Sequence, residues 1–327
     1  MTRRILAFTI ATTLIFACGN NNQPSGTSTE TDYTSVTTPD FNIDSAFSFV
    51  EQQLAFGPRT PNSQAHAKCA EYIINSIKQW TDTVIVQEFN TTLWDNTKAR
   101  GKNIIASVNP KSDDRILLAA HWDSRAYADQ DSDATKHHSP ILGANDGASG
   151  VAVLLEIARV FKKDNINLGI DYIFFDLEDQ GSPAFAENYQ SDTWCLGAQQ
   201  WAKNPHRTFY TAKYGILLDM VGSFNPRFTK EEGSMKFAPG ITNKLWTIAQ
   251  QLGYSKIFDN TQSEAILDDH MYINQNTNIP VVDIVCNQSN HSFFEHWHTT
   301  GDNLNAIDRN TLGIVAKVVM TMVLSEK

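Results

Sequence analysis

Three apolar runs in this chain end directly at a histidine or an aspartate. The runs and the residues that follow them are 116–120 with His121, 172–175 with Asp176 and 215–218 with Asp219. Short runs of this composition are typical of strands buried on both faces of a parallel sheet. Ligands of open α/β sheets gather at the carboxyl ends of the strands, so side chains at these positions are expected to meet at one site.

The remaining apolar residues follow helical and strand periods in alternation. Helical spacing predicts helices over residues 43–56, 63–80, 147–161, 193–203, 242–252 and 310–324. Strands are predicted over residues 84–89, 103–108, 115–120, 171–175, 214–218 and 279–285. Strands that alternate with helices indicate one α/β domain with a largely parallel sheet covered on both faces.

A polar stretch over residues 123–140 separates one predicted strand from the next helix. It contains Asp129, Asp131 and Asp133, followed by two adjacent histidines. We predict a long loop here, and loops of this length in a compact domain are usually functional or mobile. We expect its aspartates and histidines to be solvated rather than to bind a metal.

The first 40 residues have the composition of a processing signal and a tether. Two arginines and an apolar stretch too short to span a bilayer predict a signal peptide over residues 1–18. The segment around Cys18 resembles a bacterial lipobox, whose cysteine is lipidated; the alternative is an ordinary secretory signal with an incidental cysteine. Residues 19–40 are polar and predict a flexible tether. We therefore expect an exported bacterial lipoprotein, periplasmic or on the cell surface, anchored to a membrane through Cys18, with a folded domain over residues 41–327.

Charge and cysteine spacing argue against two common classes, nucleic-acid binders and zinc fingers. The formal net charge is −10, whereas binding a phosphate backbone needs a basic surface. Apart from the lipobox cysteine, the chain has Cys69, Cys195 and Cys286, whose spacing lacks a zinc-finger pattern. An exported protein can pair two of these three in a disulfide, and the sequence leaves the pair open.

Two carboxylates and a histidine fit a buried metal centre at the predicted sheet edge. Zinc takes three or four ligands from His, Asp, Glu or Cys, and a catalytic site leaves one position open. Asp146, Asp179 and His298 supply such a set. Glu178, next to Asp179, is placed to act as a general base beside the metal.

Several of these acidic residues also have a plainer explanation. Asp146 precedes a predicted helix and fits an N-cap. Asp219 fits a buried hydrogen-bond acceptor, and residues 268–270 fit a solvated loop. The individual signals are weak, and it is their combination and order along the chain that favours a metal site.

Four motifs, taken together, resemble the zinc aminopeptidase and glutaminyl cyclase superfamily. They are residues 121–124 (HWDS), 143–150 (GANDGASG), 174–179 (FFDLED) and 297–299 (WHT). Residues 217–222 (LLDMVG) and 268–270 (DDH) resemble the glutaminyl-peptide cyclotransferase branch, especially its bacterial form. The resemblance runs from about residue 56 to the C-terminus. It implies a three-layer α/β/α fold with a central mixed, mostly parallel twisted sheet.

The resemblance also implies roles for individual residues. It implies one zinc per chain, bound by Asp146, Asp179 and His298. It implies Glu178 as the acid/base. Asp219 and Asp269 would lie in a hydrogen-bonded network beside the substrate. Trp194 and Trp297 would form walls of the substrate pocket. Animal cyclases carry glutamate where this chain has Asp179, which shortens the ligand and keeps its type. The implied reaction converts the N-terminal glutamine of a peptide or protein to pyroglutamate and releases ammonia.

Two alternative functions remain beside the cyclase. A two-zinc aminopeptidase of the same superfamily would hold one ion with His121, Asp146 and Asp219. The other ion would be held by Asp146, Asp179 and His298, so that Asp146 serves both. Under the cyclase interpretation, His121 is not a ligand. The second alternative is a surface lipoprotein that only binds peptides, against which the presence of Glu178 argues.

Overall fold

The computed structural model describes residues 31–164, 168–288 and 293–326, of which the compact unit begins at Asp32. Cys18 and the predicted signal peptide lie outside the described residues. The lipid anchor and the export of the chain therefore stay predictions. None of the helices in the described ranges is long and apolar enough to cross a membrane.

A six-stranded mixed sheet forms the centre of this unit. Its strands, in spatial order, are β1 (Thr83–Thr92), β2 (Lys98–Val108), β4 (Gly169–Phe175), β3 (Arg115–His121), β5 (Tyr214–Asp219) and β8 (Val281–Val285). The pairs β1/β2 and β2/β4 are antiparallel, and the other neighbours are parallel. Every residue of β3, β4, β5 and β8 is buried, as their continuous apolar sequences predict. The predicted mixed, mostly parallel sheet is confirmed.

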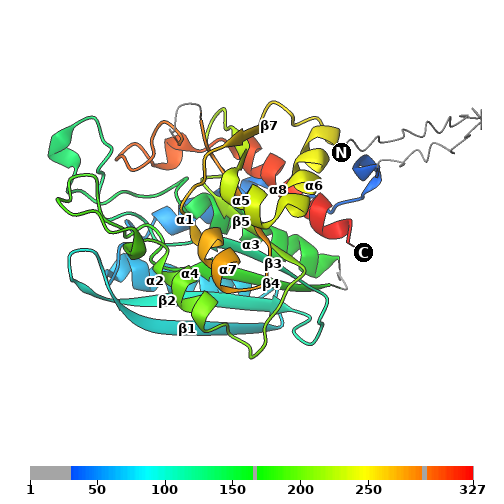
Figure 1. Ribbon diagram of the computed structural model, residues 1–327, viewed down its shortest axis with the longest axis horizontal. Coiled ribbons are helices and arrows are strands. Elements are labelled where there is room, and N and C mark those ends of the chain that lie inside the picture. Colours follow the sequence, from blue (N-terminus) through cyan, green and yellow to red (C-terminus); the bar gives the residue numbers. More distant parts are fainter. Residues whose placement is uncertain (1–30, 165–167, 289–292, 327) are drawn as a thin grey trace, which may run out of the picture. The chain divides into compact units, whose positions relative to one another are not determined.

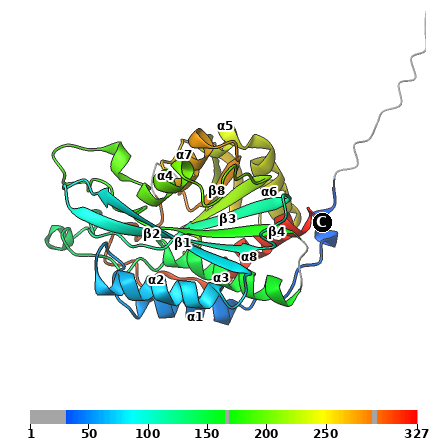
Figure 2. The same ribbon diagram turned by 90° about the horizontal axis from the view of Figure 1, so that it is seen from below.

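Helices cover both faces of the sheet, which gives three layers (Figures 1 and 2). One face carries α1 (Ile43–Leu54), α2 (Gln64–Ile77), α3 (Ala148–Lys163) and α8 (Arg309–Leu324). The other face carries α4 (Leu196–Lys203), α5 (Glu232–Phe237) and α7 (Asp269–Asn276), and α6 (Pro239–Gln251) packs against α8. Alternate side chains of β3 enter the two cores: Leu118 joins the larger one, and Leu117 joins the smaller one under α4 and α7.

Four α-helices and strands of the structure have no counterpart in the sequence prediction. They are α5, α7 and the two strands of a small parallel sheet, β6 (Phe228–Glu231) and β7 (Phe258–Ser263). Strand β7 is mostly polar and exposed, and α7 has almost no apolar face of its own. Short elements of this kind depend on tertiary contacts rather than on local periodicity, so sequence patterns do not reveal them.

The folded unit begins earlier than the predicted boundary at residue 41. Tyr33–Ser35 forms a 3₁₀ turn, and the side chains of Tyr33 and Val36 pack against the main core. The Tyr33 amide donates a hydrogen bond to Gln251 (2.8 Å), and Lys317 donates one to Thr38 (2.6 Å). The predicted tether is therefore shorter at its C-terminal end, because Tyr33 and Val36 are partly buried against the core and hydrogen bonds tie Tyr33 to α6 and Thr38 to α8.

A buried ion pair crosses the amino-terminal end of the sheet, far from the strand ends that carry the acidic residues. Arg115 donates two hydrogen bonds to Asp171, at 2.7 and 2.6 Å, and both side chains are almost fully buried. We expect Arg115→Met to lower the free energy of unfolding by about 3–5 kcal/mol, because it leaves a buried carboxylate without its cation. Urea unfolding measures this loss.

The matched control is Arg100→Met, which removes the exposed ion pair with Glu88. This change should cost less than about 1 kcal/mol, because water already solvates both charges. A similarly small loss for Arg115→Met would contradict the buried ion pair as a stabilising element.

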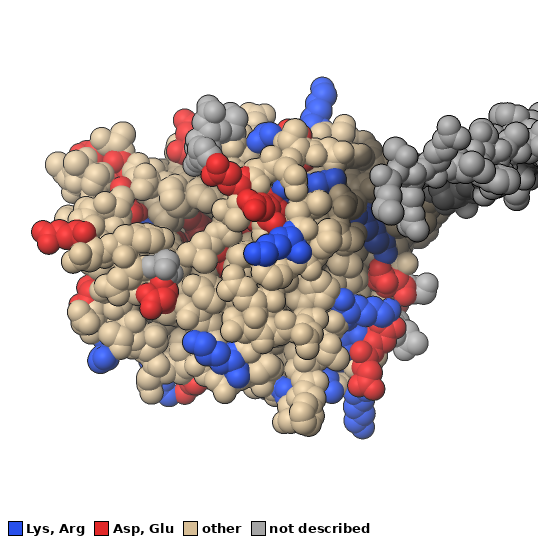
Figure 3. Space-filling view, viewed as in Figure 1, with Lys and Arg blue, Asp and Glu red and all other residues tan. Residues whose placement is uncertain are grey.

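Charged side chains of both signs are interspersed on the face of the molecule in Figure 3. Acidic groups outnumber basic ones in the whole chain, which has 36 Asp and Glu against 26 Lys and Arg. Several of the acidic side chains are buried rather than exposed, and most of those lie together beyond the carboxyl ends of β3, β4 and β5.

Candidate active site

The buried acidic residues collect at the carboxyl ends of the parallel strands. His121 ends β3, Asp219 ends β5, and Glu178 and Asp179 follow β4 after a tight turn. The two contributions from elsewhere are Asp146, just before α3, and His298, in the segment before α8. All of these side chains are buried. The site therefore lies where the rule for open α/β sheets places it.

Asp146, Asp179 and His298 come together as one group. His298 Nε2 lies 3.0 Å from an Asp179 oxygen and 3.7 Å from an Asp146 oxygen, and one ligand atom of each residue lies within 4.8 Å of the others. The second oxygen of Asp179 is buried and has no hydrogen-bond partner. Two adjacent buried carboxylates with an unpaired oxygen need a cation, and two carboxylates with one imidazole fit zinc. The residues present thus fit the metal that the sequence suggested.

A second group shares Asp146 with the first. His121 Nε2 lies 3.1 Å from one Asp146 oxygen and 3.2 Å from an Asp219 oxygen. Asp146 therefore turns one oxygen to each histidine, and both ligand sets of a two-metal site are assembled. Asp146 is not an N-cap, because Gly147 occupies that position of α3 and no side chain caps the helix.

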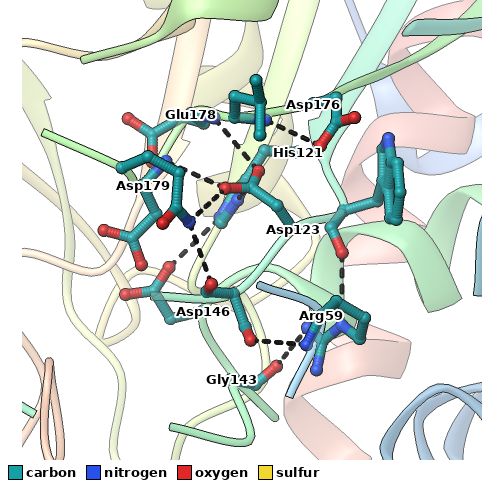
Figure 4. Close-up of polar contacts among 12 residues, drawn as sticks. Arg59, His121, Asp123, Gly143, Asp146, Asp176, Glu178 and Asp179 are labelled. Atoms are coloured by element: carbon teal, nitrogen blue, oxygen red, sulfur yellow. Dashed lines mark hydrogen bonds and ion pairs between the residues drawn. The ribbon is translucent and has the colours of Figure 1, made fainter. Parts of the chain in front are cut away.

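The turn after β4 aims Glu178 and Asp179 into the site. Leu177 adopts a left-handed conformation, with φ of 58°. The carboxylate of Asp123 accepts hydrogen bonds from the backbone amides of Glu178 (3.0 Å) and Asp179 (3.2 Å), as Figure 4 shows. Asp176, the first residue after the strand, turns away from the site and pairs with His66 (2.8 Å).

Hydrogen bonds from Arg59 and to Asp302 fix the loop that carries Asp146. Arg59 donates to the carbonyl oxygen of Gly143 (Figure 4) and to that of Leu142. Asp302 accepts a hydrogen bond from the amide of Asp146 at 3.1 Å. Gly147 lies so close to the His121 ring that a Cβ at this position would approach Nε2 to 2.4 Å. Glycine is therefore required where the loop passes the histidine.

The polar loop after Asp123 supports the metal group, contrary to the expectation that its aspartates are solvated. Asp129 and Asp131 are both buried. Asp129 accepts two hydrogen bonds from Arg125 (2.7 and 2.9 Å) and lies 3.4 Å from His298 Nδ1. Arg125 also donates to the backbone oxygen of Asp179 at 3.0 Å. The expectation of solvation was wrong for Asp129 and Asp131, because the burial of a loop aspartate depends on the segments that pack over it, and no local pattern encodes them. The expectation holds for Asp133 and His138, which are exposed.

Glu178 lies beside the metal group and is not part of it. Its side chain is 9% exposed, and burial raises the pKa of Glu178 well above its usual range. A raised pKa brings a carboxyl group closer to the neutral pH range in which a general acid/base works best. Glu178 therefore lies beside the metal group, and its acid/base role stays a prediction.

The two further acids predicted for the site are buried but lack a mutual hydrogen bond in the described contacts. Burial raises the pKa of Asp219 to about 7, and its carboxylate pairs with His121. Burial also raises the pKa of Asp269 well above its usual range, and neither of its carboxylate oxygens has a hydrogen-bond partner. Asp269 begins α7, with Asp268 as the N-cap, so residues 268–270 form a buried helix start rather than a solvated loop.

A narrow pocket of about 50 Å³ leads to these groups. Its base is formed by Asp146, Glu178, Asp179, Asp219, Asp268 and His298. Its walls include Trp194 and Trp297, and both indole rings stack on His298, at centroid distances of 6.0 and 3.8 Å. A wider groove of about 860 Å³ shares these two tryptophans and continues from the pocket. Trp194 and Trp297 therefore line the pocket, and their contact with a substrate stays a prediction.

Fold and site together define an α/β protein with a candidate metal centre at the carboxyl ends of its parallel strands. The model of peptidase family M28 matches residues 103–323, and the chain belongs to this family. A glutaminyl-peptide cyclotransferase of Drosophila melanogaster is 27% identical over 289 residues, which cover 80% of this chain and 75% of that relative.

Two crystal structures resemble the chain over nearly all of its folded part. The glutaminyl cyclase of Bacteroides thetaiotaomicron, bound to N-acetylhistamine, is 45% identical with a TM-score of 0.87. A Zn-dependent exopeptidase of Parabacteroides distasonis is 47% identical with a TM-score of 0.86. Each match covers 89% of this chain and 100% of the other. The chain is thus similar both to a cyclase and to a protein described as an exopeptidase.

Proposed function

We propose that the chain is a zinc-dependent glutaminyl-peptide cyclotransferase, which converts an N-terminal glutamine of peptides or proteins to pyroglutamate and releases ammonia. The observation that carries this proposal is the narrow pocket in which Glu178 lies beside Asp146, Asp179 and His298 under two tryptophans. The similarity to a glutaminyl cyclase over the folded part of the chain supports the same choice. The proposed location is unchanged from the sequence prediction, on the outer side of a membrane with Cys18 as the anchor.

One zinc held by Asp146, Asp179 and His298 would supply a Lewis acid at the γ-carbonyl oxygen of the substrate. Glu178 accepts a proton from the α-amino group, whose nitrogen attacks the γ-carbonyl carbon. The new C–N bond closes a five-membered lactam, the bond to the side-chain amide nitrogen breaks, and Glu178 returns the proton to the departing ammonia. Nucleophile and electrophile belong to one residue, so the pocket's main task is to hold the reactive rotamer.

The remaining site residues fit supporting roles in this reaction. Trp194 and Trp297 line the narrow pocket, where their rings would hold the glutamine side chain in its reactive rotamer. Asp219 lines the same pocket as Glu178, and Asp269 is a buried carboxyl group close enough to raise the pKa of Glu178. Closely spaced carboxyls do not all ionise together. A proton retained among them is available for a hydrogen bond to the developing oxyanion.

An aminopeptidase is the second candidate function, because His121 and Asp219 complete a second metal group around Asp146. The similarity to a Zn-dependent exopeptidase points the same way. We favour cyclisation because glutaminyl-peptide cyclotransferases match the chain over most of its folded part, and because Asp268 and Trp297, from the motifs that resemble the cyclase branch, line this pocket.

Product analysis separates these two functions. Incubation with a peptide that begins with glutamine should release ammonia and leave a peptide of unchanged residue count. A peptide of the same sequence that begins with leucine is the control and should remain intact. Release of free amino acids from either peptide would establish the aminopeptidase and reject the cyclase.

A further inference from the structure

The carboxylate of Glu178 receives a hydrogen bond from a side chain that the proposed reaction does not use. The Sγ atom of Cys195 lies 3.2 Å from Glu178 Oε1, and the thiol has no exposed surface. Among the residues that the structure describes, this thiol is the one group that donates a hydrogen bond to the Glu178 carboxylate. The orientation of the proposed acid/base therefore depends on few contacts, and Cys195 supplies one of them.

The backbone holds this thiol in place from both sides. The amide of Cys195 donates to the Glu178 carbonyl oxygen (2.8 Å), and the amide of Leu196 donates to the Leu177 carbonyl oxygen (3.0 Å). Cys195 adopts a left-handed conformation, with φ of 54°, directly before α4. A non-glycine residue in this conformation costs about 1–2 kcal/mol, so the surrounding contacts over-determine the position of the thiol.

The thiol is suited to donate a hydrogen bond rather than to act as a nucleophile. Burial raises the pKa of Cys195 well above its usual range, and the carboxylates of Glu178, Asp269 and Asp268 raise it further. A protonated thiol offers its S–H to the nearest carboxylate oxygen. The three cysteines of the described chain are free, so no disulfide occupies this sulfur.

We infer that Cys195 is a positioning residue that orients the Glu178 carboxylate toward the substrate's α-amino group, an inference that rests on the proposed cyclase function. The preceding residue, Trp194, lines the pocket and stacks on His298, and the Arg125 guanidinium lies 4.6 Å from its ring centroid. Trp194 in the pocket wall and Cys195 beside the acid/base are thus adjacent in the chain. Their contacts fix the positions of the wall and of the Glu178 carboxylate relative to the metal group.

Paired substitutions at Cys195 test this inference in the zinc-loaded full chain. Cys195→Ala should lower kcat about tenfold, the loss expected for a hydrogen bond to a charged group, and leave KM within about twofold. Cys195→Ser should recover most of the lost kcat, because a hydroxyl donates to the same oxygen. Zinc content should be unchanged in both variants, since the thiol is not among the proposed ligands. The matched control is Cys69→Ala, which removes an equally buried thiol that makes no described hydrogen bond to a carboxylate and should retain wild-type kcat.

The infrared S–H stretching band gives a second readout that does not depend on turnover. The Cys195 band, isolated by subtracting the Cys195→Ala spectrum, should lie below the Cys69 band and move upward in Glu178→Gln, whose neutral amide is a weaker acceptor. Any one of four results would overturn the inference. They are an unshifted infrared band, a wild-type kcat in Cys195→Ala, equal losses of kcat in the Ala and Ser variants, and loss of zinc in Cys195→Ala. Absence of ammonia release by the wild-type protein would reject the proposed function alone, since the infrared band would still report the hydrogen bond.

Discussion

Glu178→Gln should lower kcat by about 10²–10⁴-fold, the range that general acid/base catalysis contributes. Glutamine has nearly the same shape as glutamate and cannot carry the proton from the α-amino group to the departing ammonia. Neither carboxylate of the proposed metal group is altered, so zinc should remain bound. Ammonia release from a glutamine peptide measures the rate, and metal analysis of the same sample measures the zinc.

The control for this variant is Glu187→Gln, which removes an exposed glutamate outside the pocket. It changes the net charge by the same amount and should leave the rate unchanged. Near-normal activity of Glu178→Gln would remove the acid/base role from Glu178. A large loss in Glu187→Gln would show that net charge, rather than the position of the carboxylate, controls the rate.

His298→Ala should remove both the metal and the activity. The histidine is the single imidazole of the group formed with Asp146 and Asp179, and two carboxylates alone are a weak site for zinc. We expect about one zinc per chain in the wild-type protein and almost none in the dialysed variant, with kcat/KM lower by about 10³-fold or more. The control is His138→Ala, which removes an exposed histidine and should retain metal and activity. Retention of zinc in His298→Ala would contradict the proposed ligand set.

The same measurement decides between one and two metal ions. His121→Ala should keep about one zinc per chain if the protein is a cyclase, because His121 then only supports Asp146 and Asp219. In a two-metal aminopeptidase, the wild-type chain holds about two ions, and His121→Ala loses one of them. Two firmly held ions in the wild-type protein would therefore favour the aminopeptidase over the cyclase.

Local sequence patterns were sufficient to predict the elements that are regular and apolar. Strand β3 and helix α3 lie within a few residues of their predicted bounds, because continuous burial and an amphipathic period are written in the sequence itself. Strand β7 and helix α7 were missed, since their residues are polar and are held by contacts with other elements. The reason is physical: apolar periodicity shows which apolar side chains an element buries, and it gives no signal where the buried side chains are polar, as in α7.

The residues of the site also fall into those that the sequence predicted and those that it did not. Asp146, Asp179 and Glu178 were predicted to meet because they follow or precede regular elements whose ends converge in an open α/β sheet. His298 lies between β8 and α8, and it was named as a ligand from its residue type and its Trp-His-Thr motif. Asp129, Arg125 and Asp302, which fix these side chains, come from loops whose burial no local pattern encodes. Asp131, expected in solvent, accepts hydrogen bonds from Thr300 for the same reason.

By itself, the sequence determined the class of fold, the buried strands and the identity of the side chains that could hold a metal, because these depend on residue type and spacing along the chain. Only the tertiary structure decided which contacts hold those side chains: the loop acids around His298, the thiol beside Glu178, and the pairing of Asp219 with His121 rather than with Asp269. These contacts join segments distant in sequence, and their free energy exists only after the layers have packed. The start of the folded unit at Asp32 belongs with them, since it depends on the packing of Tyr33 and Val36 against the main core and on hydrogen bonds to α6 and α8.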